Sequence, residues 1–152
     1  MLVSFGKHKG KTVARLVTKE ADYVKWVLGQ PDATGGLARL RSEMIRLIHI
    51  FDSKPIIGTC YHRGCERPPT RFSAYVGAEG GLFAWCDLCD PYEAGAFPGR
   101  LAIVRSYKDG LQHVESTCEG RKAGYRAIIR EMAIRKGLPK RSGEAALDGF
   151  FA

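Results

Sequence analysis

Residues 60–89 read CYHRGCERPPTRFSAYVGAEGGLFAWCDLC, and they decide how the middle of the chain folds. Four cysteines form two close pairs, Cys60 with Cys65 and Cys86 with Cys89. Between the pairs, RFSAYV and LFAW flank the turn-rich GAEGG, which predicts a β-hairpin. The hairpin would bring together two short turns that each carry two thiolates, as a tetrahedral Zn²⁺ requires. The stretch therefore predicts a zinc-ribbon-like module in which one Zn²⁺ stabilises a lobe with a thin core.

Two other interpretations of these cysteines remain open. The first pair encloses a wider gap than the usual zinc-ribbon knuckle, so His62 inside it is an alternative ligand in place of one sulfur. Alternatively, all four are reduced thiols, some of them buried as small hydrophobic side chains. A shell of four sulfurs leaves no position for water, so the metal would be structural. Cys118 has no cysteine near it in the sequence and is expected to be a free thiol at the start of a helix.

The residues on both sides of this stretch predict an α+β fold. Apolar residues recur at helical spacing over residues 18–28 and 37–51, and again in a last helix that contains Ile128 and ends at Gly137. Ser116-Thr-Cys-Glu119 fits a capping box for that last helix.

A second hairpin is expected after the cysteine module. LAIVRSY and LQHVE flank Lys108-Asp109-Gly110, a typical turn sequence. The chain is then divided into four parts. Residues 1–55 form a lysine-rich and helical N-terminal lobe, 56–98 the zinc module, 99–139 a hairpin with a basic helix, and 140–152 a flexible tail.

The charge of the chain favours a polyanionic partner. The 152 residues carry a formal net charge of +8, with a pI of about 9.4, which suits nucleic acid, although an ordinary basic soluble protein is the alternative. No apolar run approaches the length of a membrane span, and no hydrophobic signal segment precedes the first glycine. A cytoplasmic protein without membrane contact is expected, in which cysteines bind metal or stay reduced.

The N-terminal FGKHKGKT predicts a turn that grips phosphate. It is not a nucleotide-binding loop, because only three residues separate Gly6 from Gly10, where that loop needs four. Lys7, Lys9 and Lys11 alternate, so an extended segment would present all three on one face, toward phosphates. The aromatic side chains near this turn are expected to pack beneath it, with stacking on bases as the alternative; they are Phe5, Tyr23 and Trp26.

Two further basic groups are candidate contacts with nucleic acid. Eight basic and two acidic residues lie between Glu119 and Arg141. The candidates in the last helix are Arg121, Lys122, Arg126 and Arg130, and those in the zinc module are Arg63, Arg67 and Arg71. The alternatives are a solvated helix face and ordinary solubility.

No arrangement of residues typical of catalysis is found in the sequence. The acidic residues are scattered, the histidines lack metalloprotease spacing, and no serine lies in a G-x-S-x-G elbow. The sequence therefore favours a binding protein over an enzyme.

The N-terminal motif resembles that of a known domain. Phe5, Gly6, Lys7, Lys9, Gly10, Lys11, Tyr23 and Trp26 follow the pattern F-G-K-x-K-G-K with a later Y-x-x-W. This pattern resembles the small C-terminal domain of exodeoxyribonuclease X-type nucleases, over about the first thirty residues and without the nuclease domain.

The resemblance implies that residues 1–55 form a DNA-binding lobe, in an accessory factor of replication, repair or a mobile element. DNA is then a more suitable partner than RNA. The alternatives are a structural subunit of a larger nucleoprotein machine such as an RNA-guided complex, a small metal-dependent nuclease, and a zinc adaptor that binds only proteins.

The C-terminal residues resemble a PCNA-interacting peptide, the motif that binds sliding clamps. The matching residues are Glu144, Leu147, Phe150 and Phe151, with Glu144 at a position where that motif has glutamine. A sliding clamp is therefore one candidate partner, which would bind the apolar anchors Leu147, Phe150 and Phe151. The alternative is that the phenylalanines fold back onto the protein's own surface.

Overall fold

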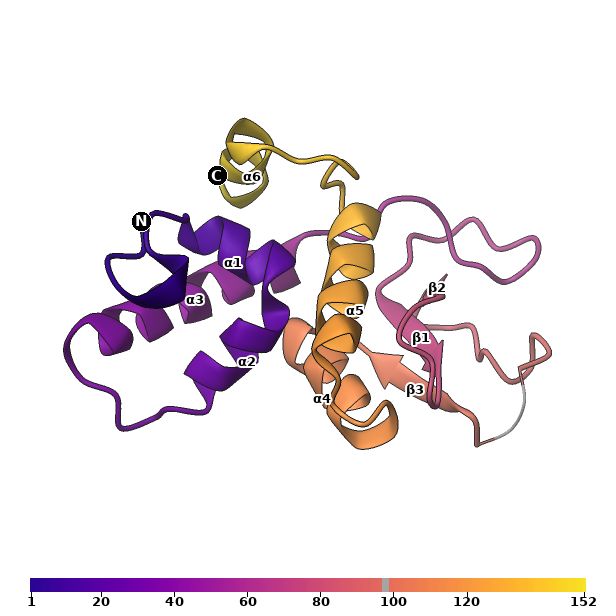
Figure 1. Cartoon of the computed structure of the whole chain (residues 1–152). Coiled ribbons are helices and arrows are strands. Elements are labelled where there is room, and N and C mark those ends of the chain that lie inside the picture. Colours follow the sequence, from indigo (N-terminus) through magenta and orange to yellow (C-terminus); the bar gives the residue numbers. More distant parts are fainter. Residues whose placement is uncertain (97–98) are drawn as a thin grey trace.

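The computed structural model describes residues 1–96 and 99–152. The fold is α+β, as expected from the sequence: the described residues form helices and one small antiparallel sheet (Figure 1). The elements in chain order are a 3-10 helix Gly6–His8, α1 Val13–Lys19, α2 Ala21–Leu28, α3 Gly35–Ser53, β1 Arg71–Tyr75, β2 Phe83–Trp85, β3 Leu101–Val104, α4 Tyr107–Thr117, α5 Lys122–Arg135 and α6 Glu144–Phe151.

The sheet has the strand order β2-β1-β3, with β1 antiparallel to both neighbours. Phe72 in the central strand faces Ala84 on one side and Val104 on the other. The expected hairpin of RFSAYV and LFAW is confirmed. Helix α5 stands between the sheet and the N-terminal helices (Figure 1), so its buried residues Ile128 and Ile129 join the two parts in one core.

The expected second hairpin is wrong. Its first half is β3, but its second half belongs to helix α4, with Lys108-Asp109-Gly110 in the first turn. Ser106 caps this helix by accepting a hydrogen bond from Asp109 N–H. Gly110 allows close helix packing rather than a strand turn, because a Cβ atom there would lie only 3.1 Å from Met132 Sδ on α5.

The capping box expected at Ser116–Glu119, before the helix that the structure shows as α5, is also wrong. Thr117 is the last residue of α4, and its hydroxyl donates to the carbonyl of His113. Cys118 is buried at the end of α4 rather than at the start of α5. Glu119 and Gly120 both have positive φ, of 62° and 61°, and form the sharp turn that leads to α5.

The N-terminal lobe contains one helix more than the sequence indicated. The segment 18–28 is divided at Glu20, and α1 begins earlier, where Thr12 accepts a hydrogen bond from Arg15 N–H. The α1 residues Leu16 and Val17 are completely buried. The helix expected over 37–51 is confirmed as α3.

The tail expected to be flexible is folded. Glu144–Phe151 forms α6, in which Leu147 is fully buried and Phe150 and Phe151 are each 8% exposed. Phe150 packs edge-on against Phe51 of α3, with ring centroids 6.0 Å apart. A short helix places these apolar side chains on one face, which then packs on α1 and α3 instead of facing water. None of the helices in the described ranges is long and apolar enough to cross a membrane.

Candidate metal centre and basic surface

The hairpin brings the four cysteines of the central stretch together. The Sγ atoms of Cys60, Cys65, Cys86 and Cys89 all lie within 4.8 Å of one another, and those of Cys65 and Cys86 are 3.9 Å apart. In a tetrahedral site with metal–sulfur bonds of about 2.3 Å, the sulfurs lie about 3.8 Å apart. The four cysteines are therefore close enough to hold a metal ion.

Backbone hydrogen bonds fix the first pair of cysteines beside the sheet. Gly64 has a φ of +81°, which lets the chain turn back so that Cys65 N–H donates to the His62 carbonyl at 3.0 Å. Tyr61 N–H donates to the Ala84 carbonyl in β2, which attaches this loop to the strand that leads to Cys86. The wide gap of the first pair is thus accommodated by a loop that is fastened to the sheet.

The second pair of cysteines forms a tight knuckle. The backbone N–H groups of Leu88 and Cys89 donate to the Cys86 sulfur. Burial opposes ionisation of Cys86, but these hydrogen bonds, together with those from the thiols of Cys89 and Cys60, outweigh it and lower its pKa to about 6. Burial and the neighbouring sulfurs raise the pKa of Cys89 to about 12. Four thiolates at this distance repel one another, so a bound cation would let all four ionise together.

The surroundings of the cluster fit a structural ion. Cys60 and Cys86 are buried and form a small apolar cluster with Trp85, whose indole N–H donates to Ser73 Oγ at 2.7 Å. His62 is not one of the four grouped ligands; its Nδ1 lies 3.3 Å from Cys89 Sγ, where it can orient that sulfur. Of the arginines expected to bind nucleic acid here, Arg63 and Arg67 are exposed, whereas Arg71 donates to the Cys89 carbonyl at 2.7 Å.

The lysine turn has the tight geometry that its glycines predict. Gly6 and Gly10 have positive φ, and Val3 exchanges backbone hydrogen bonds with Gly10 and Lys11. The expected row of lysines on one face is wrong, because Gly6–His8 is a 3-10 helix and not an extended segment.

The three lysines of the turn have different surroundings. Lys11 pairs with Glu20 at 3.3 Å, and Lys7 lies over the ring of Tyr23, 5.9 Å from its centroid. Lys9 is exposed. Of the aromatic residues expected to pack beneath the turn, Phe5 and Tyr23 are half-buried and pack against the core, whereas Trp26 is 52% exposed.

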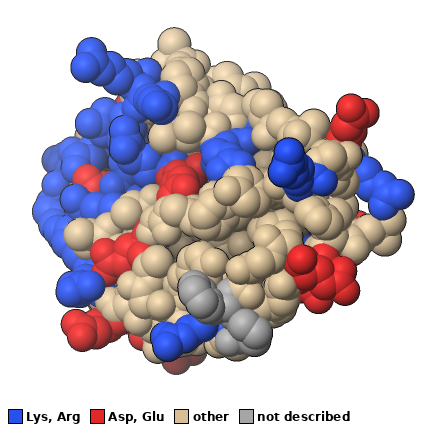
Figure 2. All heavy atoms as spheres, turned by 90° about the vertical axis from the view of Figure 1, so that its right-hand side faces the viewer, with Lys and Arg blue, Asp and Glu red and all other residues tan. Residues whose placement is uncertain are grey.

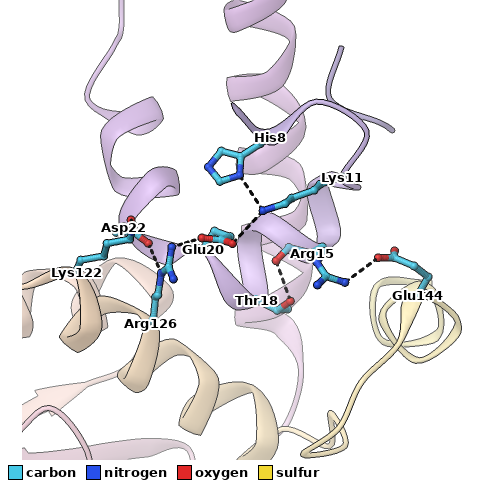
Figure 3. A network of polar contacts seen from close by, with 9 residues as sticks. All are labelled: His8, Lys11, Arg15, Thr18, Glu20, Asp22, Lys122, Arg126 and Glu144. Carbon is cyan, nitrogen blue, oxygen red and sulfur yellow. Dashed lines mark hydrogen bonds and ion pairs between the residues drawn. The ribbon is translucent and has the colours of Figure 1, made fainter. Parts of the chain in front are cut away.

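Three of the four basic residues expected to contact nucleic acid from α5 and its N-cap take part in ion pairs. Arg121 pairs with Glu79 at 3.2 Å, and Lys122 pairs with Asp22 at 3.9 Å. Arg126 pairs with both Asp22 and Glu20, where α1 meets α2 (Figure 3). The remaining candidate, Arg130, is exposed.

A basic groove that sequence reasoning missed runs beside α5. It has a volume of about 810 Å³ and lies between α5, the end of α1 and the segment that leads to α6. Its apolar lining includes Ala123, Ala127, Ile134 and Leu138, and its cations are Lys19, Arg126, Arg130, Lys140 and Arg141. Of the residues that the structure describes, no Asp or Glu lines it.

Only some of the residues that form this groove are close together in the sequence. Arg126 and Arg130 lie one turn apart on α5, and Lys140 and Arg141 are adjacent, but Lys19 joins them only through the fold. Its ammonium donates to the Ser142 carbonyl at 2.7 Å and holds the connecting segment in place. Figure 2 shows Lys and Arg gathered along the left of the view, which is the side that faces the reader in Figure 1.

The residues of the expected clamp-binding motif all contact the protein itself. Glu144 accepts a hydrogen bond from Thr12 Oγ1 at 2.8 Å and lies 3.7 Å from Arg15. Leu147, Phe150 and Phe151 belong to the main hydrophobic core. A clamp would reach these side chains only after α6 had left its place.

No protein-family model, curated protein or solved structure matches this chain.

Proposed function

We propose that this protein binds nucleic acid, DNA in preference to RNA, as a non-enzymatic accessory factor of replication, repair or a mobile element. The observation that carries the proposal is the basic groove, in which five cations and none of the described carboxylates surround an apolar floor. Such a surface attracts phosphates without reading sequence.

The cations of the groove divide into those that shape it and those free to bind. Arg126 is engaged by Asp22 and Glu20, and Lys19 by the Ser142 carbonyl. Arg130, Lys140 and Arg141 are exposed, so these three would make the principal phosphate contacts. Each such contact releases condensed counterions, which makes binding depend steeply on salt concentration.

The cysteine cluster would hold one Zn²⁺ with a structural role in this account. Four sulfur ligands leave no open coordination position, so the ion would stabilise the loops around β1 and β2 and would not activate water. Arg63 and Arg67 lie exposed on the first of these loops and would extend the basic surface.

The proposal is tested by the affinity for a labelled oligonucleotide, measured by fluorescence anisotropy. The groove variant carries Arg130→Gln, Lys140→Gln and Arg141→Gln. The charge-matched control carries Arg100→Gln, Arg105→Gln and Lys108→Gln, which change exposed residues outside the groove. The groove variant is expected to bind about tenfold or more weakly than wild type, and the control within about threefold.

Equal losses in the two variants would show that net charge alone drives the association. Absence of binding by the wild-type protein would remove the proposal. Cleavage of the oligonucleotide in the presence of Mg²⁺ would contradict the non-enzymatic role and favour the small nuclease.

A further inference from the structure

A second hollow, with a volume of about 530 Å³, opens beside the lysine turn. Three aromatic residues, one glycine and one leucine line it together with one cation and one carboxylate: Phe5, Gly6, Lys7, Asp22, Tyr23, Trp26 and Leu37. Trp26 is 52% exposed there, although tryptophan is usually well buried. The hollow therefore presents an aromatic surface to solvent.

The geometry of α2 holds this aromatic surface in place. Val24 and Val27 on its inner face are completely buried, Tyr23 is half-buried beside them, and Trp26 faces solvent. The rings of Tyr23 and Trp26 are stacked, with centroids 5.8 Å apart and an interplanar angle of 23°. The near-parallel rings form one aromatic surface, of which Trp26 is the exposed part.

The shelf formed by Tyr23 and Trp26 is supported from behind and carries positive charge. His8 is 5% exposed and packs on Tyr23 with centroids 4.3 Å apart. Its Nε2 atom is buried and has no hydrogen-bond partner within the described part of the chain. Lys7 lies over the Tyr23 ring, and Lys9 is exposed on the same turn. Aromatic rings beside ammonium groups match the base and the phosphate of a nucleotide.

One ion pair connects the hollow with the basic groove. Asp22 lines the hollow, Arg126 lines the groove, and Arg126 Nε lies 2.8 Å from Asp22 Oδ1. Figure 3 shows this pair between α2 and α5, with Glu20 beside it. The hollow and the basic groove are therefore adjacent.

We propose that the Tyr23–Trp26 shelf stacks an unpaired base of a single-stranded nucleic acid whose phosphates lie in the basic groove. This inference rests on the proposed nucleic-acid binding and adds a preference for single strands. Bases in a duplex are stacked on their neighbours and do not present a free face to an aromatic side chain. Stacking on an aromatic platform tolerates any base, which fits a surface that grips the backbone without reading sequence.

The test compares single-stranded and duplex DNA of equal length for wild type, Trp26→Ala and Trp26→Phe. Trp26→Ala is expected to lose about 5- to 150-fold in affinity for the single strand, the range of one base–aromatic stack, with duplex affinity unchanged. Trp26→Phe keeps a stacking face and is expected to stay within about threefold of wild type. Val76→Ala, which truncates an apolar side chain that is 47% exposed just after β1 and lines neither hollow, is the matched control and is expected to change neither affinity.

Intrinsic fluorescence gives a second readout. The chain has two tryptophans, and Trp85 is 4% exposed, so quenching by unstacked oligo-dT is expected to come from Trp26 and to disappear in Trp26→Phe.

The outcomes separate this inference from the proposed function. Wild-type binding with equal affinity for both forms and no effect of Trp26→Ala would overturn the inference and leave nucleic-acid binding intact. Equal losses for single strand and duplex in Trp26→Ala would also overturn it, because the residue would then act on the fold. If wild type binds neither form, the proposed function fails together with the inference.

Discussion

Arg126 on α5 and Asp22 on α2 are joined by an ion pair of 2.8 Å across 104 residues of sequence. The same guanidinium also contacts Glu20, which in turn pairs with Lys11 of the lysine turn. Figure 3 shows this chain of alternating charges, which connects the N-terminal turn to the helix that lines the basic groove. The pair thus holds the aromatic shelf and the groove next to each other.

The Arg126–Asp22 pair is expected to stabilise the fold by a modest amount. Because Arg126 is 38% exposed, solvent screens the interaction, and a coupling free energy of about 1 kcal/mol is expected. The measurement is a double-mutant cycle with Arg126→Gln and Asp22→Asn in urea unfolding. A coupling energy near zero would mean that packing between the helices, and not this pair, sets their relative position.

Metal binding is expected to depend on four cysteines and not on the fifth. The purified wild-type protein should contain one metal ion per chain, and zinc is the expected ion. Cys65→Ser and Cys89→Ser should lose most of it, because each change leaves an incomplete shell. Cys118→Ser, at the buried end of α4, is the control and should keep a full equivalent. Metal analysis of the four proteins decides the matter, and an equal content in all of them would contradict the assignment.

Stability is expected to decrease in mild acid because of His8. Burial, and then the charge of Lys11, lower the pKa of His8 below its ordinary value of 6.5. The unfolded chain therefore takes up this proton at a higher pH than the folded chain does. The free energy of unfolding should consequently fall as the pH drops through 6.5 toward the lowered pKa.

The matched protein for this pH experiment is His8→Asn, which has no titrating ring. The difference in unfolding free energy between wild type and His8→Asn should shift against wild type as the pH falls below 6.5. A difference that stays constant with pH would show that His8 titrates alike in both states.

The C-terminal helix is expected to contribute to the stability of the whole protein. Leu147 is completely buried, so Leu147→Ala should destabilise the fold by about 2 to 5 kcal/mol. Asp148→Ala, on the exposed side of the same helix, should change stability by no more than about 0.5 kcal/mol. Thermal unfolding measures both. Equal, negligible effects would favour a peptide that is held ready for a sliding clamp.

The cysteine cluster and the first hairpin could be predicted because their signals are local. Two thiolates in one short turn and a glycine-rich loop between β-rich runs each specify their own structure. The prediction of a second hairpin was wrong because Lys108-Asp109-Gly110 resembles a turn between strands. In the structure Ser106 caps a helix there, and Gly110 fits against Met132. That contact depends on α5, which the local sequence does not contain.

The binding surface was harder to predict because it depends on residues far apart in the sequence. Periodicity identified α2 but did not tell which face would remain in water, so Trp26 was expected beneath the turn. The groove joins Lys19 to residues beyond 120, and the ion pairs of Lys11 and Arg126 appear only when the two ends of the chain meet. The net charge of the sequence predicted a positively charged binding surface but not where on the fold it lies.

The salt dependence of single-strand binding measures how many phosphates lie in the basic groove. For a single strand, each phosphate contact adds about −0.7 to the slope of log affinity against log salt concentration. If Arg130, Lys140 and Arg141 each contact a phosphate, their combined change to glutamine should make the slope shallower by about 2, while the control with changes at Arg100, Arg105 and Lys108 should keep the wild-type slope. Identical slopes for wild type and the groove variant would contradict the account, because the groove would then hold no phosphates.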